Sequence, residues 1–281
     1  SQHIAEPFVE IHPADAARHG IGDADIVRVS SPRGEVLVRA LVTPRQRQGS
    51  LFAPVHWTDQ FAARGRLDTL TAPLTDPVSG QPALKHVAAR VETFAAKAFG
   101  FAVTRQKPAS IAAPYWAVAR CRGGWRVELA FADADIDWAG FAASLFGAPP
   151  GGDTLAYHDR DAGQHRIAAF DGDQLSGALF VAPGPVAVSR GWAAEQLDAT
   201  HAGQRQRFRI VAGRAGADRP DAGAIVCSCF SVGANQIAAA VAGGCTSVEA
   251  IGGTLKAGTN CGSCRAEIRT IIQANRVQAA E

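Results

Sequence analysis

Four cysteines near the carboxy terminus have the spacing of a metal site. Cys227 and Cys229 form a C-x-C pair, and Cys261 and Cys264 form a C-x-x-C pair beyond residues 230–260. Two chelating thiolate pairs can complete a tetrahedral zinc site or hold a di-iron cluster. Because four of the six cysteines are paired in this way, the pattern indicates metal binding in a reducing compartment rather than a disulfide framework.

Helices between the two cysteine pairs would bring them together. A first helix is expected at about 233–241, and a second begins with the capping-box pattern of residues 246–249 and closes at Gly258. A third helix follows Cys264, so the positive end of its dipole favours a thiolate at that residue. Its inward-facing side chains are expected to be Ile268, Ile271 and Ile272.

Spacing alone leaves the identity of the metal open. Zinc sites more often use C-x-x-C on both sides, so the C-x-C pair favours iron–sulfur over structural zinc, with a metal-free chain as the third possibility. A zinc-stabilised chain would be an interaction protein without a redox role. Cys121 and Cys245 lie outside the pattern and are expected to be small, partly buried side chains.

Residues 1–95 have the pattern of a β-rich domain. Strands are expected at 8–11, 25–30, 35–43, 51–55 and 85–94, with a short helix between Pro13 and Gly20. Residues 36–38 are apolar on both faces of their strand, which favours a closed β-barrel over a one-sided sheet. The irregular stretch at 59–82 has the length of a binding loop.

Residues 106–222 predict a separate α+β module. Strands are expected at 123–129, 154–158, 165–170 and 175–182, and helices at 138–146 and 192–199. The Gly- and Ala-rich segment 213–223 is interpreted as a flexible linker to a small all-α module at 224–277. His158 and His165 flank a hairpin turn, and a metal role is not expected for them.

Composition excludes several functions. The net charge of +2 comes without a basic stripe, so no nucleic-acid partner is expected. Apolar runs are too short for a membrane helix, and no signal peptide is apparent, so a cytoplasmic location with no membrane partner is expected. The chain begins with Ser and contains no Met, which suggests a portion of a longer protein.

Residues 226–230 and 257–264 resemble the bacterioferritin-associated-ferredoxin family of [2Fe–2S] domains, and the resemblance covers nearly all of 225–273. It implies that Cys227, Cys229, Cys261 and Cys264 ligate a [2Fe–2S] cluster that passes single electrons.

Residues 8–17, 22–36, 52–57 and 76–82 resemble the carboxy-terminal dinucleotide-binding domain of bacterial molybdopterin oxidoreductases. The resemblance implies a barrel that closes over bis-molybdopterin guanine dinucleotide, with polar contacts from His56, Trp57, Gln81 and Lys85. Trp57 could instead be a core residue and Lys85 a solvated charge. This sequence has Asp68 and Ala83 where the family usually has Asn and Glu, and an acid near phosphates is unfavourable, so Asp68 is not assigned as a contact.

The order of the modules is similar to the end of the assimilatory nitrate reductase large subunit. It implies an oxidoreductase whose molybdenum ligand, [4Fe–4S] cluster and nitrate pocket lie upstream, so this chain alone is expected to be inactive. Electrons from a ferredoxin, a flavodoxin or an NADH-linked flavoprotein would pass through the [2Fe–2S] cluster to molybdenum, where nitrate becomes nitrite. The alternatives are a formate dehydrogenase or another molybdenum oxidoreductase, and a separate electron-transfer or docking module.

Overall fold

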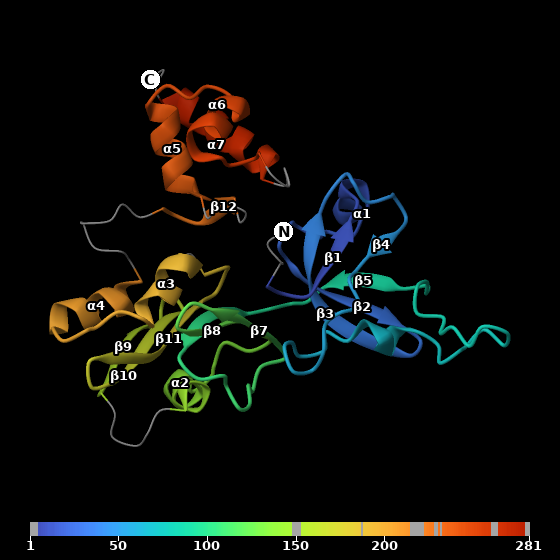
Figure 1. The fold of residues 1–281 in the computed structure, drawn as a ribbon, viewed down its shortest axis with the longest axis horizontal. Coiled ribbons are helices and arrows are strands. Elements are labelled where there is room, and N and C mark those ends of the chain that lie inside the picture. The colour runs from blue at the N-terminus through green and yellow to red at the C-terminus, as the bar shows by residue number, and fades with distance from the viewer. Residues whose placement is uncertain are drawn as a thin grey trace.

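The computed structural model describes residues 5–147, 153–186, 188–213, 222–227, 230, 232–259 and 264–278. It contains a five-stranded sheet, a six-stranded sheet and a carboxy-terminal module of three helices with a two-stranded sheet (Figure 1). None of the described helices is both long and apolar enough to cross a membrane.

The amino-terminal sheet has the strand order β4-β1-β3-β2-β5. Its strands are β1 (Phe8–Ile11), β2 (Ile26–Ser31), β3 (Gly34–Val42), β4 (Leu51–Phe52) and β5 (Arg90–Thr93). The predicted hairpin is confirmed, because β2 and β3 pair antiparallel, and β1 adds to β3 in parallel. Helix α1 (Pro13–Arg18) connects β1 to the hairpin, and Gly20 takes the expected left-handed conformation after it.

The two edge strands β4 and β5 do not pair with each other within the described residues, so barrel closure is not observed. The two-sided apolar pattern of β3 has another cause. Val36 and Val38 face the core of the amino-terminal sheet, whereas Leu37 packs with Tyr115 and Ala130 of the second sheet. The strand is therefore buried on both faces because a neighbouring sheet covers its outer face.

The six-stranded sheet has antiparallel neighbours throughout and the order β7-β8-β6-β11-β10-β9. Its strands are β6 (Ala98–Thr104), β7 (Tyr115–Cys121), β8 (Gly124–Phe131), β9 (Asp153–Asp159), β10 (Gln164–Asp171) and β11 (Gln174–Ala182). Strand β6 precedes the predicted module start at residue 106, yet it lies inside this sheet between β8 and β11.

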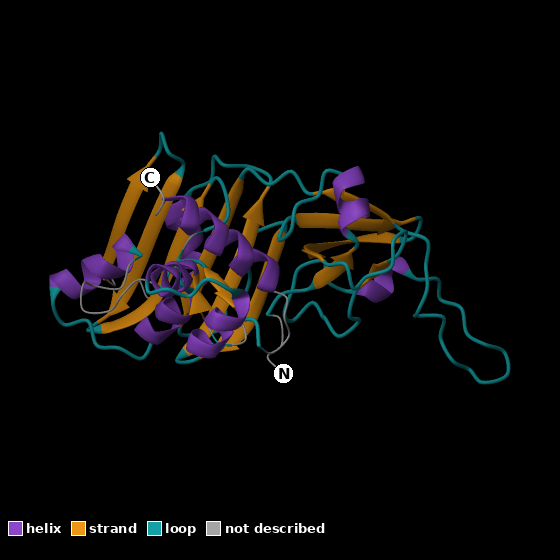
Figure 2. Ribbon diagram, turned by 90° about the horizontal axis from the view of Figure 1, so that it is seen from above, coloured by secondary structure: helices purple, strands orange, loops and turns teal. Residues whose placement is uncertain are grey.

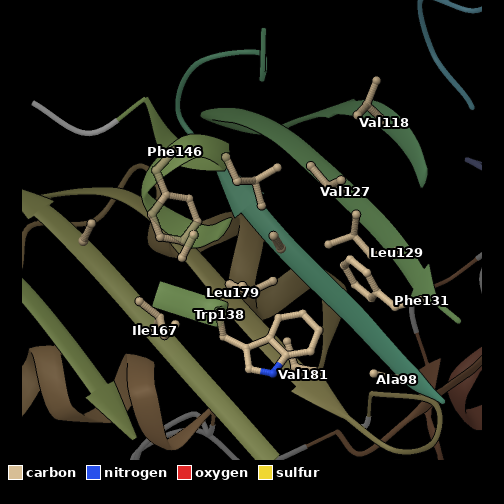
Figure 3. Packing of buried hydrophobic residues seen from close by; sticks show 14 residues of the cluster. Ala98, Val118, Val127, Leu129, Phe131, Trp138, Phe146, Ile167, Leu179 and Val181 are labelled. Carbon is tan, nitrogen blue, oxygen red and sulfur yellow. The ribbon is translucent and has the colours of Figure 1, made fainter. Parts of the chain in front are cut away.

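Helices cover both faces of this sheet. Helix α2 (Trp138–Phe146) contributes Trp138, Leu145 and Phe146 to the core on one face (Figure 3). Helices α3 (Arg190–Gln196) and α4 (Gln204–Ala212) contribute to the core on the other face. The predicted helix at 138–146 is confirmed residue for residue, because Asp137 caps its first turn and Gly147 ends it in a left-handed conformation.

The carboxy-terminal module consists of β12 (Ile225–Cys227), β13 (Val232–Gly233), α5 (Ala234–Ala242), α6 (Val248–Leu255) and α7 (Arg265–Gln278). Because β12 and β13 pair antiparallel, the expectation of an all-helical module is not met. The three helices form at the predicted positions, but α6 is capped by Ser247 rather than by Thr246. It ends at Lys256, which adopts a left-handed conformation and closes the helix two residues before the expected Gly258. Gly258 is left-handed as well.

Candidate functional site

Two of the four motif cysteines lie in one hydrophobic core. Cys227 ends β12 and is 2% exposed, and Cys264 precedes α7 and is 5% exposed. Both belong to a cluster that includes Ile251 and Ile268. Cys229 and Cys261 lie outside the described residues. The fold therefore brings the first cysteine of one pair and the last cysteine of the other into the same core.

Cys264 stands where a helix favours negative charge. The Ile268 amide donates to the Cys264 carbonyl at 2.9 Å, as in the first turn of a helix. Cys264 therefore lies at the positive end of the α7 dipole. A buried cysteine at the amino end of a helix suits a ligand of an iron–sulfur cluster.

The segment that leads to Cys261 is held against the start of α7. Gly258 has a φ of +78°, and a Cβ atom there would lie 3.2 Å from the Arg265 Cγ atom. The Arg265 guanidinium donates to the Gly258 carbonyl and forms an ion pair with Glu249 of α6. Backbone hydrogen bonding and then Arg265 lower the pKa of Glu249 below its usual value. Arg265 at the start of α7 thus contacts both Glu249 of α6 and Gly258, three residues before Cys261.

The sequence analysis missed this role of Arg265. Glu249 had been interpreted as the partner in a capping box, and its ion pair with Arg265 spans two helices. The sequence offered one signal of this role, which is that Arg265 directly follows Cys264.

The two cysteines outside the motif are half-buried, as expected. In the carboxy-terminal module, the Cys245 sulfur lies 3.4 Å from the hydroxyl of Thr254 in α6. Cys121 ends β7, where burial raises the pKa of its thiol. Both keep the properties of structural side chains.

The predicted pterin contacts all lie in loops of the amino-terminal domain. His56 and Trp57 follow β4, whereas Gln81 and Lys85 lie between the short 3-10 helix η1 (Leu67–Leu70) and β5. Trp57 is half-buried and the other three are exposed. Within the described residues no hydrogen bond or ion pair joins any two of them, so their role as contacts stays a prediction.

Residues 73–90 form a continuous exposed strap that extends away from the sheet (Figures 1 and 2). Asp76 orders its turn, because its carboxylate accepts from the amides of Val78 and Ser79, and these bonds lower its pKa. The strap nevertheless exposes large apolar side chains, with Val78 at 95%. Its exposed apolar residues are Leu74, Val78, Leu84 and Val87. Such a surface is typical of a segment that another part of a protein or a ligand covers.

Asp68 is an ion-paired residue. Arg66 donates to both of its carboxylate oxygens, at 3.3 and 2.9 Å, and also to Asp59. The hydrogen bonds from Arg66 lower the pKa of Asp68 below its usual value. The negative charge that argued against Asp68 near phosphates is thus offset by its neighbour.

Two segments of the chain match protein families. Residues 1–88 match the family described as Molydopterin dinucleotide binding domain, and residues 225–274 match the BFD-like [2Fe-2S] binding domain. Each match covers less than half of the chain. Together they assign it a molybdopterin dinucleotide and a [2Fe–2S] cluster as cofactors.

The particular relatives include nitrate reductases. Over 99% of this chain the sequence is 34% identical to nitrate reductase from Klebsiella oxytoca. It is 35% identical over 31% of the chain to the assimilatory nitrate reductase catalytic subunit of Bacillus subtilis. The F420-dependent formate dehydrogenase 1 subunit alpha of Methanococcus maripaludis is 44% identical over 33% of the chain. The chain spans 31%, 12% and 14% of the length of these three proteins.

Proposed function

We propose that this chain is the carboxy-terminal cofactor-binding and electron-transfer portion of a molybdenum-dependent assimilatory nitrate reductase, which reduces nitrate to nitrite. One observation carries the proposal: the similarity to the Klebsiella nitrate reductase runs through 99% of the chain. The similarity to the Methanococcus formate dehydrogenase covers only 33% of the chain. The alignment with nitrate reductase therefore includes the six-stranded module as well as the two cofactor-binding domains.

We assign the [2Fe–2S] ligands to Cys227, Cys229, Cys261 and Cys264. The shared core of Cys227 and Cys264 supports the assignment, because two buried cysteines in one core, one of them at the start of a helix, can both reach a cluster. When bound, the cluster supplies one-electron transfer. The burial of Cys227 and Cys264 excludes water from their side chains, and Arg265 holds Gly258 at the start of α7.

The exposed strap would lie over the dinucleotide. We propose that Gln81 and Lys85 donate to its polar groups, with His56 and Trp57 beside them. The exposure of the strap supports this role, since its apolar residues need a cover in the complete enzyme. In that enzyme the cofactor would be bis-molybdopterin guanine dinucleotide, and a [4Fe–4S] cluster would lie in another region.

The electron donor is proposed to be a cytoplasmic ferredoxin, flavodoxin or NADH-linked flavoprotein. Phe230 directly follows Cys229 and is 40% exposed, which places an aromatic side chain at the surface beside the cysteine motif. Exposed aromatic residues are enriched at protein interfaces. We expect Phe230→Ala to slow reduction by the donor protein while reduction by dithionite is unchanged.

The cluster assignment is tested by iron and acid-labile sulfide analysis of anaerobically purified protein, with EPR after dithionite reduction. We expect about two irons and two sulfides per chain and an S = 1/2 signal. The signal should be lost or altered in Cys227→Ser and Cys261→Ser and kept in the matched control Cys245→Ser. One zinc with no sulfide would instead identify a structural zinc site and remove the redox role.

The substrate is tested in the complete enzyme that contains this chain. Reduced viologen should drive nitrate reduction, and formate should not reduce oxidised viologen. The opposite result would favour the second candidate, a formate dehydrogenase, which the 44% identity of the dinucleotide-binding segment supports. A chain that works apart from any molybdenum enzyme would show neither activity and would be a separate electron-transfer module.

A further inference from the structure

Two histidines face each other across the hairpin of β9 and β10. His158 and His165 are directly opposite in the antiparallel register, and their Nδ1 atoms lie 2.9 Å apart. Their ring centroids are 5.2 Å apart. From the sequence a metal role is not expected for them, because only strand pairing brings their rings together.

The histidine pair borders an open hollow of about 600 Å³. The first turn of α2 and the segment before it also line the hollow, including Asp135, Asp137 and Trp138. The Trp138 ring lies 5.7 Å from the His165 ring. The hollow is therefore lined by two histidines and two aspartates and has room for a hydrated ion.

The nitrogen spacing matches a known coordination geometry. Imidazole nitrogens bind first-row metal ions at about 2.0–2.1 Å, so two of them at a right angle are about 2.9 Å apart. Right angles between adjacent ligands occur in octahedral, square-planar and tetragonal sites, and tetragonal sites with nitrogen and oxygen ligands are the ones that Cu²⁺ and Ni²⁺ prefer. The observed Nδ1–Nδ1 distance thus corresponds to two adjacent positions of such a site.

We propose that His158 and His165 form a two-nitrogen binding site for a divalent transition-metal ion of the Ni²⁺ or Cu²⁺ type. Each Nδ1 atom provides one ligand, and water fills the other positions. Within the described residues no group of three or more His, Cys, Asp or Glu could hold a metal. The site therefore binds an exchangeable ion and differs in residues and chemistry from the cysteine cluster.

The surrounding charges favour a cation. Asp135 and Asp137 line the hollow, and Asp159 follows His158, against the single positive charge of Arg160. A neutral imidazole is the form that binds metal, and the proton shared between the two Nδ1 atoms moves to an Nε2 atom when the ion enters, so each ring keeps one N–H group.

The test is calorimetric titration of Ni²⁺ into the full chain with its cluster intact, followed in parallel by tryptophan fluorescence. We expect one ion per chain at this site, with a change in Trp138 emission because its ring contacts His165. His158→Ala and His165→Ala should each weaken binding by about tenfold or more, as expected from the loss of a metal ligand. The matched control is His19→Ala, which removes an exposed histidine far from the pair in sequence.

A variant that is expected to bind Ni²⁺ more tightly distinguishes an effect on binding from an effect on folding. Arg160→Gln removes the nearby positive charge and should tighten Ni²⁺ binding by about twofold, which an unfolded chain would not show. In EPR, Cu²⁺ bound to the oxidised protein should show hyperfine splitting from two nitrogens. Equal Ni²⁺ affinity in the wild type and both alanine variants would overturn the proposal and leave a hydrogen-bonded histidine pair.

Discussion

The two sheets are joined by a buried network that converges on one carboxylate oxygen. The Glu6 Oε2 atom accepts from Arg39 Nε at 2.8 Å and from the Tyr115 hydroxyl at 2.7 Å. Glu6 and Arg39 belong to the amino-terminal domain, whereas Tyr115 lies on β7 of the second sheet. Burial alone would lower the pKa of Arg39, but Glu6, Tyr115 and Glu128 together outweigh it, so that pKa is raised.

We predict that Glu6→Gln lowers the free energy of unfolding by about 3 kcal/mol. Removing one partner of a buried ion pair costs about 3–5 kcal/mol, because the remaining charge loses its compensation. The lower end applies here, since the Arg39 side chain stays 22% exposed and keeps its bond to the Ala24 carbonyl. Tyr115→Phe removes one hydrogen bond to a charged acceptor and should cost about 1.5 kcal/mol.

The assay is urea unfolding followed by tryptophan fluorescence and circular dichroism. The matched control is Glu35→Gln, because Glu35 pairs with Arg28 and Arg64 but its side chain is 42% exposed. Exposed pairs contribute about 0–1 kcal/mol, so this variant should stay close to the wild type. Equal losses in Glu6→Gln and Glu35→Gln would refute the conclusion that the junction is a stabilising buried network.

Three further predictions follow from single residues. Burial and the Glu6 carboxylate raise the pKa of Tyr115, so alkaline absorbance titration should show a tyrosine phase well above the ordinary value of about 10. The stability from Tyr115 is therefore complete below its ordinary pKa and is lost as pH rises through the raised one; Tyr115→Phe should abolish this phase. Gly177→Ala places a methyl group 2.3 Å from the Phe146 ring and should cost about 1–3 kcal/mol in urea unfolding, whereas Gly184→Ala, with open space around it, should not. Gly258→Ala strains a left-handed position by about 1–2 kcal/mol and should lower the iron content of purified protein; unchanged iron content would contradict a role for this loop in holding the cluster.

The sequence by itself determined the local elements and the chemistry of the cysteine motif. Strand β1 and helix α2 form at the predicted residues, because strand periodicity and helix caps depend on near neighbours. The cysteine spacing favoured iron–sulfur over zinc, the resemblance to bacterioferritin-associated ferredoxins implied a [2Fe–2S] domain, and residues 225–274 match that family. Metal chelation needs short, regular spacings, so this signal is readable without the fold.

Only the tertiary structure decided which distant residues meet. Strand β6 lies in the middle of the second sheet, Leu37 is covered by Tyr115, and Glu249 of α6 forms an ion pair with Arg265 of α7. His158 and His165 came together only once β9 and β10 had paired in register. These contacts depend on how sheets and helices pack over long sequence separations, and local propensity carries no information about that packing.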